Sequence, residues 1–171
     1  MERKTTETWA LNMKVPLEPG IVCHDVNLML NFYVGALGLQ MVADAQTTPE
    51  LSEKVGATPH GYRIVRLQTS YGERIKLVQP NKQAPSPKPV PQWVFERHGL
   101  AYLTFVIENI QGVVKQLRNH GVKTISEEPV EVRKGVFALF AVDPEGNYIE
   151  FVEYPDISAY RPDLFKSSAV G

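Results

Sequence analysis

The chain has 171 residues, of which 43% are hydrophobic, and its 18 Lys and Arg nearly balance 19 Asp and Glu to give a formal net charge of -1. This balance, without a run of like charge, argues against a nucleic-acid-binding protein, and no stretch approaches the ~18 apolar residues of a membrane span. Cys23 is the single cysteine. It excludes an internal disulfide and a cysteine-based zinc cage, and a reducing, cytoplasmic location is expected.

The first half of the chain predicts one main helix among strands, after a polar N-terminal arm over residues 1–13. The arm lacks the apolar core of a secretory signal. A strand over residues 14–23, bent at Pro19, leads to a helix that Asp25 can cap and Gly38 can end. The apolar positions of this helix form one stripe at Val26, Leu30, Tyr33 and Leu37. After it we expect a short strand over 39–43, a short helix over 48–55 and a hairpin of strands over 62–68 and 74–79.

Residues 81–98 predict an extended linker. Five prolines fall between residues 80 and 98, and the stretch has no apolar pattern of its own. After the linker the first pattern starts again, with a strand over 103–107 and a helix that Asn109 can cap. The remaining predicted elements are a short strand near 122–125, a loop over 127–129, a strand over 135–142 and, after a turn at 143–147, a final strand.

The two halves match in order, which predicts an internal repeat. A shift of 84 residues places Glu18 on Tyr102, and a shift of 74 places Lys76 on Glu150. Each half has one helix ahead of hairpin-linked strands, which disfavours a doubly wound sheet. The predicted fold class is α+β, with a βαβββ module over residues 14–80, a second over 99–154 and a C-terminal tail over 155–171. The curved sheets of the two modules would enclose a cleft.

Three stretches carry a resemblance to a known family. They are Gly20-Ile21-Val22-Cys23-His24-Asp25-Val26, then Asn31-Phe32-Tyr33 with Leu37-Gly38-Leu39, and above all Asp143-Pro144-Glu145-Gly146-Asn147-Tyr148-Ile149-Glu150. In this order they closely resemble the glyoxalase, bleomycin-resistance and extradiol-dioxygenase superfamily, also called vicinal oxygen chelate, over about residues 15–154. The resemblance implies paired βαβββ modules around a cup-shaped site. It leaves the reaction open, because the family includes isomerases, epimerases, lyases, thiol transferases, dioxygenases and drug-binding proteins.

The resemblance also implies four metal-ligand positions, on the first and last strands of each module. They fall on Glu18, Lys76, Tyr102 and Glu150, where metal-binding members usually have His, Glu or Gln, His and Glu. An ammonium at Lys76 has no lone pair for a metal, and neutral Tyr102 is a poor substitute for imidazole. We therefore expect no cofactor. A divalent metal is disfavoured, and the alternative is a weak or atypical site through Glu18, Glu150 and a loop histidine such as His60.

The same four residues are the candidate catalytic set. Lys76 can pair with Glu150 and Glu18, and such a pair has a structural interpretation, a frozen salt bridge that stabilises a buried carboxylate. In the catalytic interpretation, Lys76 stabilises an oxyanion or acts as a base, Glu150 or Glu18 moves a proton, and Tyr102 donates a hydrogen bond. By strand parity, the residues expected to contact a ligand are Val22, Thr104, Val106, Tyr148 and Val152, with His60 at the mouth of the cup.

These residues predict an isomerase or lyase that transfers a proton next to a carbonyl of a small, partly apolar organic molecule, without the usual four-ligand metal site. The first alternative is a non-catalytic binding protein of the bleomycin-resistance type, and the second is an enzyme with the atypical metal site. The expected partner is the small molecule, with neither nucleic acid nor membrane. A homodimer is expected by analogy with the family.

Overall fold

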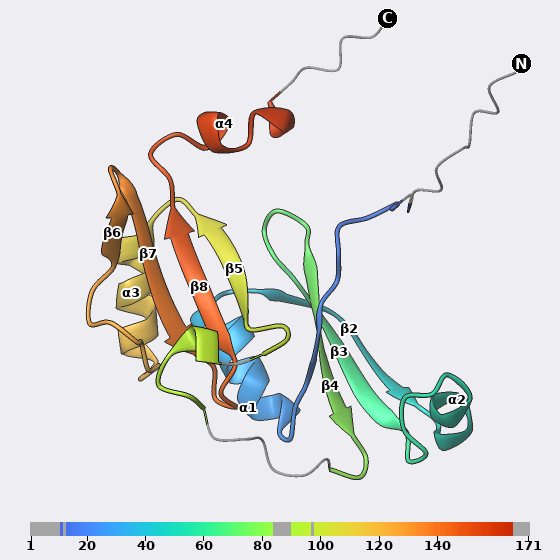
Figure 1. Ribbon diagram of the computed structural model, residues 1–171. Coiled ribbons are helices and arrows are strands. Elements are labelled where there is room, and N and C mark those ends of the chain that lie inside the picture. Colours follow the sequence, from blue (N-terminus) through green and yellow to red (C-terminus); the bar gives the residue numbers. More distant parts are fainter. Residues whose placement is uncertain (1–10, 12, 84–89, 97, 166–171) are drawn as a thin grey trace, which may run out of the picture.

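Two four-stranded mixed sheets form the framework of the protein (Figure 1). The structure is a computed structural model that describes residues 11, 13–83, 90–96 and 98–165. The strand order is β1-β4-β3-β2 in the first sheet and β5-β8-β7-β6 in the second. Most of the predicted N-terminal arm and the middle of the predicted linker lie outside the described residues.

The first sheet contains β1 (Gly20–Val22), β2 (Gln40–Thr47), β3 (Tyr62–Gln68) and β4 (Arg74–Pro80). Strands β1 and β4 run parallel, and the other neighbours are antiparallel. Helix α1 (Val26–Leu30) continues directly into a π-helix (Asn31–Ala36), and α2 (Pro49–Lys54) connects β2 to β3. As predicted, Asp25 caps α1, Thr48 caps α2, and Gly38 takes a positive φ of 74° just after the π-helix.

The second sheet repeats this plan with β5 (Tyr102–Ile107), β6 (Val130–Arg133), β7 (Val136–Val142) and β8 (Tyr148–Glu153). Strands β5 and β8 are parallel, and α3 (Ile110–Asn119) follows β5 with Asn109 as its cap. A 3-10 turn (Val94–Glu96) precedes this module, and α4 (Ile157–Tyr160) and a second 3-10 turn (Pro162–Leu164) follow it. In the described residues no helix has the length and apolar character needed to cross a membrane. The predicted fold of two βαβββ modules is confirmed.

Strand register makes the internal repeat exact at the candidate site. Gly20 lies opposite Lys76 across β1 and β4, and Thr104 lies opposite Glu150 across β5 and β8. The shifts of 84 and 74 residues inferred from the sequence therefore superimpose the two pairs. Lys76 and Glu150 occupy the same structural position in the two modules.

Four local predictions differ from the structure. Strand β1 is only three residues long, because the prolines before it lack the N–H group that a strand donates. Strand β2 extends to Thr47, beyond its predicted end at residue 43. The predicted strand near 122–125 is a single bridge between Thr124 and Ala141. Strand β6 was not predicted: the predicted loop ended at residue 129 and the next predicted strand began at residue 135, and all residues of β6 are exposed.

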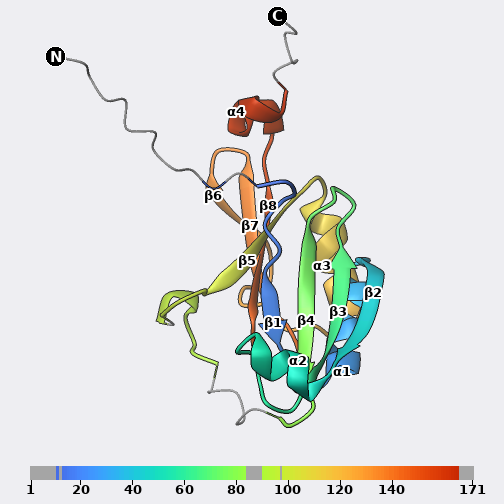
Figure 2. The same ribbon diagram turned by 90° about the vertical axis from the view of Figure 1, so that its right-hand side faces the viewer.

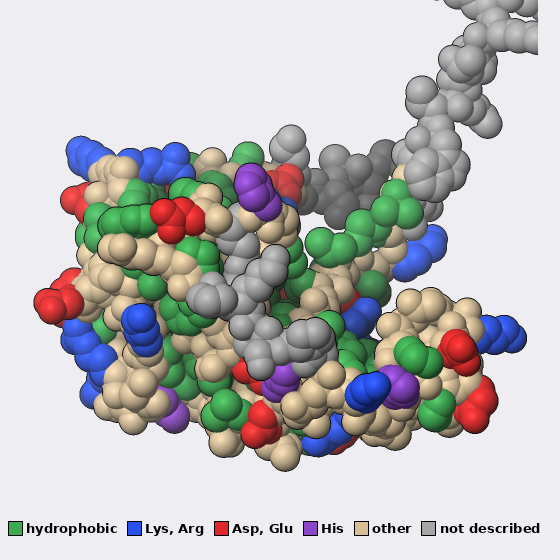
Figure 3. Space-filling model, turned by 60° about the horizontal axis from the view of Figure 1, so that its bottom comes forward, with side chains coloured by type: hydrophobic (Ala, Val, Ile, Leu, Met, Phe, Trp, Pro, Cys, Tyr) green, Lys and Arg blue, Asp and Glu red, His purple; other side chains and the backbone are tan. Residues whose placement is uncertain are grey.

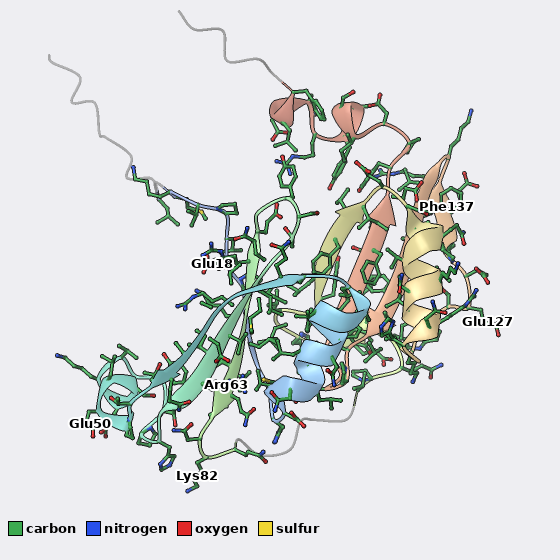
Figure 4. The ribbon with its side chains drawn as sticks, turned by 180° about the vertical axis from the view of Figure 1, so that it is seen from behind. Glu18, Glu50, Arg63, Lys82, Glu127 and Phe137 are labelled. Atoms are coloured by element: carbon green, nitrogen blue, oxygen red, sulfur yellow. The ribbon has the colours of Figure 1, made fainter. Side chains whose placement is uncertain are left out.

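Both modules share one hydrophobic core on the helix side of the sheets. Seen from behind, α1 and α3 lie in front of the strands, so the two helices cover the same side of the framework (Figure 4). Figure 2 shows the same arrangement from the side. The buried cluster joins residues of both halves, among them Met29, Phe32 and Leu77 of the first and Leu117, Leu139 and Ile149 of the second. The surface in Figure 3 carries acidic and basic side chains interspersed, as the balanced composition predicts.

Side chains of the turn before β8 form hydrogen bonds with residues of the first module. The Glu145 carboxylate accepts backbone hydrogen bonds from His24 (2.8 and 2.9 Å) and Asp25 (2.7 Å), at the start of α1 in the other module. Tyr33, fully buried, donates its hydroxyl to Asp143 at 3.0 Å. Burial raises the pKa of the Asp143 carboxyl above its ordinary value, although its hydrogen bonds from Asn147 and Tyr33 oppose the shift. Burial, and next the nearby Asp143 carboxylate, also raise the pKa of Tyr33.

Candidate functional site

The candidate site residues lie on the faces of the two sheets that point away from α1 and α3, which we call the open faces. In β4, Ile75 and Leu77 are buried in the core, so Lys76 between them points to the open face. In β8, Ile149 and Phe151 belong to the core, and Glu150 points the opposite way. Each open face therefore carries one central charged residue.

Lys76 forms an ion pair with Glu18, with 3.1 Å between its Nζ and the carboxylate. The two side chains are 31% and 23% exposed, so the pair is only partly shielded from solvent. Gly20, directly across from Lys76, has no side chain that could contact the Lys76 ammonium. The Pro19 carbonyl accepts a hydrogen bond from the Lys76 backbone, which holds Glu18 beside the strand (Figure 4).

Glu150 has a different neighbour. Thr104, its direct partner across β5 and β8, donates its hydroxyl to Oε2 of Glu150 at 2.6 Å. Within the described part of the chain this is the one hydrogen bond of the Glu150 carboxylate, and its other oxygen, Oε1, accepts none. The predicted ion pair of Lys76 is thus formed with Glu18 and is not formed with Glu150 in the described residues.

Tyr102 lies in an aromatic cluster. Its ring meets Phe140 edge to face at 5.4 Å and lies 6.0 Å from Phe95. This packing orients the ring through apolar contacts. Its position, two residues before Thr104 on β5, places Tyr102 on the same open face as Glu150.

The other predicted ligand contacts differ widely in exposure. Val22 is 62% exposed, and Thr104 and Val106 are exposed as well. Val152 is buried at 6%, and Tyr148 is completely buried, with its hydroxyl donated to the Pro91 carbonyl. His60 lies exposed in the loop before β3, where its carbonyl accepts a hydrogen bond from Asn81. The accessible predicted residues are therefore Val22, His60, Thr104 and Val106, whereas Tyr148 and Val152 are buried.

The donor set does not fit a divalent metal. Lys76 occupies one of the four positions with a group that has no lone pair, and its charge is already paired with Glu18. Tyr102 is packed among aromatic rings. Among the described residues no three His, Cys, Asp or Glu side chains cluster in a way that could hold a metal ion.

Three polar residues of the first open face are not among the site residues predicted from the sequence. Arg66 lies directly opposite Lys76 across β3 and β4, and Gln68 lies opposite Arg74, whose Nε donates to its amide oxygen at 2.8 Å. The alternation of polar and apolar residues in β3 could have indicated them. Val65 and Leu67 are buried, so Arg66 and Gln68 between and after them share the face of Lys76.

Cys23 is excluded as a nucleophile. Its side chain is 2% exposed, and burial, followed by the nearby carboxylates of Glu145, Asp143 and Asp25, raises the pKa of the thiol to about 12. Because the thiolate is the reactive form, the thiol is inert at neutral pH.

Two cavities lie near the open faces. The smaller, of about 150 Å³, adjoins the Lys76–Glu18 pair and is lined by Val15, Pro16, Glu18, Gly72 and Arg74. The larger, of about 590 Å³, lies between residues 90–93 and the turn before β8, with Lys123 and Trp93 in its wall.

Solved structures with the same fold share little sequence with this chain. A glyoxalase family protein from Bacillus cereus is 20% identical, with a TM-score of 0.68 over 84% of this chain and 95% of its own. A glyoxylase/bleomycin resistance protein/dioxygenase domain from Frankia sp. is 12% identical, with a TM-score of 0.65 over 85% and 95%. The trypanothione-dependent glyoxalase I of Leishmania major is 21% identical, with a TM-score of 0.60 over 88% and 97%.

No curated protein matches the chain significantly. The model of one protein family does match, over residues 16–151, which include all four strands of both sheets except the end of β8. This match covers most of the chain, and the observed fold agrees with it. The chain belongs to the Glyoxalase/Bleomycin resistance protein/Dioxygenase superfamily.

Proposed function

We propose that this protein is an isomerase or lyase that moves a proton at a carbon next to the carbonyl of a small, partly apolar organic molecule. The observation that carries the proposal is the state of Glu150. Its carboxylate stands on an open face, with Thr104 bound to Oε2 and with Oε1 not hydrogen-bonded within the described chain. A carboxylate held through one oxygen can accept a proton at the other.

The remaining residues supply electrostatic support. When Oε1 of Glu150 takes the proton, the electron pair of the C–H bond moves into the carbonyl and creates an enolate oxygen. The ammonium of Lys76, held in place by Glu18, supplies a positive charge that stabilises this oxygen. The hydroxyl of Tyr102 can donate a hydrogen bond to the same atom. Return of the proton to the opposite face of the same carbon completes an isomerisation at that centre. Loss of a leaving group from the next carbon, on the side away from the carbonyl, completes an elimination.

Hydrogen–deuterium exchange tests the proton transfer directly. Phenylpyruvate and hydroxyacetone would be incubated with the protein in D2O, and loss of the signal of the protons next to the carbonyl would be followed by NMR. We expect exchange above the protein-free rate, lowered about 100-fold by Glu150→Gln and also lowered by Lys76→Met. Glu127→Gln and Lys82→Met are matched controls, because both residues are exposed and lie far from Glu18 in Figure 4. Unchanged exchange in Glu150→Gln would contradict the proposal.

A second candidate is a protein that binds the small molecule without chemistry. The ion pair between Lys76 and Glu18 favours it, because a cation already neutralised by a carboxylate needs no catalytic role. Saturable binding of either compound with exchange no faster than the blank would support this candidate over the first. Elemental analysis of the purified protein tests the third possibility, since a stoichiometric divalent metal would show that the atypical site exists.

The expected homodimer and the cytoplasmic location stay predictions. Exposed apolar side chains on the open faces, Val22 at 62% and Val106 at 43%, support the dimer, because a second copy would remove them from water. Sedimentation equilibrium measures the mass, and a monomer at about 100 μM would contradict the dimer.

A further inference from the structure

Three cations share the open face of the first sheet. Arg66 on β3 lies directly opposite Lys76 on β4, and Arg74 precedes Lys76 by two residues on the same strand and the same face. We call these three residues the cationic patch. Like charges on directly opposed residues of neighbouring strands destabilise a sheet. The arrangement therefore has a cost that the fold itself does not require.

The patch is only partly neutralised by the protein. Glu18 pairs with Lys76 at 3.1 Å, and Arg74 donates to the uncharged amide of Gln68. In the part of the chain that the structure describes, Arg66 has neither an ion pair nor a hydrogen bond for its guanidinium. Three positive charges thus face one carboxylate.

Arg63, on the same strand, shows the contrast. Its side chain points to the helix side of β3, where Nε and Nη2 bind both carboxylate oxygens of Asp44 at 2.9 and 2.7 Å, and Nη1 reaches Asn27. The guanidinium of Arg63 is thus paired within the protein, whereas that of Arg66 has no partner among the described residues.

The internal repeat shows that the βαβββ fold does not require cations at these three positions. Shifted by 74 residues, Arg66, Arg74 and Lys76 superimpose on Phe140, Tyr148 and Glu150, since Phe140 faces Glu150 across β7 and β8 as Arg66 faces Lys76. The same scaffold thus places two aromatic residues and an acid at these positions in one half and three cations in the other.

We propose that the cationic patch binds the anionic group, a carboxylate or a phosphate, of the small molecule on which the protein acts. Guanidinium groups bind both kinds of anion through paired hydrogen bonds. The cavity of about 150 Å³ lined by Arg74 and Glu18 adjoins the patch and gives room for such a group. Glu18 then competes with the ligand for Lys76. The assignment rests on the proposed function only in taking the bound molecule to be the substrate, since Lys76 belongs both to the patch and to the proposed catalytic set.

An NMR titration tests this site without any requirement for turnover. Benzoate and phenyl phosphate serve as anionic probes, and benzamide is the neutral analogue of benzoate. We expect saturable shifts at Arg66, Arg74 and Lys76 with the anions and none with benzamide. Loss of one charge-assisted contact in Arg66→Gln should weaken binding about tenfold, whereas Arg63→Gln on the same strand should leave it unchanged. Glu18→Gln should tighten binding by removing the competing carboxylate.

Each outcome bears on the proposal. Saturation by one anion only would support the site and identify carboxylate or phosphate as its ligand. Equal weakening by Arg63→Gln and Arg66→Gln, equal binding of benzamide, or absence of saturation would overturn it. Anion binding at the patch without proton exchange on carbonyl compounds would refute the catalytic function and leave this site intact. Exchange with an unchanged KM in Arg66→Gln would refute this site and leave the function intact.

Discussion

Thr104 and Glu150, opposite each other across the parallel strands β5 and β8, are joined by a hydrogen bond of 2.6 Å from the threonine hydroxyl to the carboxylate. The corresponding position in the first module is Gly20, which has no side chain, and there Lys76 pairs instead with Glu18. The central charge of the second sheet is therefore bound by its neighbour across the strands, and that of the first sheet by a carboxylate ahead of β1.

Replacement of Thr104 tests whether this bond matters for chemistry. Thr104→Val keeps the shape and removes the donor, so we expect the proton exchange described above to fall about tenfold, with stability changed by only ~1 kcal/mol because the site is exposed. Thr104→Ser restores the hydroxyl and should restore the rate. Exchange rates in D2O and urea denaturation measure the two effects. A slow serine variant would show that the methyl group, and not the hydrogen bond, is required.

Glu145 should stabilise the protein from the second module by capping a helix of the first. Its carboxylate accepts the backbone N–H groups of His24 and Asp25, a cap whose loss costs about 1–2 kcal/mol. Glu145→Ala should lower the free energy of unfolding by that amount in urea denaturation. Glu127→Ala, an exposed position in a loop, should change it by less than about 0.5 kcal/mol. Equal effects of the two substitutions would rule out the capping role.

Tyr33→Phe should destabilise the protein in a pH-dependent way. The Tyr33 hydroxyl donates to Asp143, and this hydrogen bond favours the charged carboxylate. Burial raises the pKa of the Asp143 carboxyl above its ordinary value of 3.8. The bond is therefore weaker in acid, where Asp143 is protonated, and reaches full strength once the pH has risen through that raised pKa.

The wild-type and Tyr33→Phe proteins should thus differ by about 1.5–3 kcal/mol at neutral pH and by less near pH 4. Parallel urea denaturations across this range measure the difference. The opposite trend, with the larger difference in acid, would mean that the hydroxyl favours the protonated carboxyl.

Cys23 should resist thiol reagents in the folded protein. Burial raises the pKa of its thiol to about 12, so below that pH the group stays in the unreactive protonated form and is also shielded from the reagent. We expect no reaction with Ellman's reagent at neutral pH and one equivalent of reactive thiol in about 6 M guanidinium chloride. Rapid reaction of the native protein would show that the strand around Cys23 opens readily.

The sequence predicted the structure best where a residue pattern is compatible with only one local structure. Helix caps at Asp25, Thr48 and Asn109 were predicted because a side-chain oxygen before an apolar stripe satisfies free N–H groups. The repeat gave the equivalence of Lys76 and Glu150, which strand register confirms. Strand β6 was missed because its alternation of apolar and polar residues covers only four positions, all of them exposed, at the edge of the sheet beside β7.

Pairings between charged side chains were less predictable. Which carboxylate would meet Lys76 depended on Gly20 being its neighbour and on Thr104 binding Glu150, and both facts require the register of two strands at once. The hydrogen bond from the buried Tyr148 hydroxyl to the Pro91 carbonyl joins residues 57 positions apart. Contacts of this kind follow from tertiary structure alone.

The shared core constrains the two surfaces of each sheet unequally. A substitution on the helix side disturbs packing in both modules, because residues such as Phe32 and Leu139 belong to one cluster. Residues at open-face positions such as Arg66 and its counterpart Phe140 lie outside that shared cluster, so a change there leaves the shared core intact. Duplication of the module therefore gave this protein two copies of one scaffold whose outward surfaces could diverge in charge independently, and ligand preference could change without a new fold.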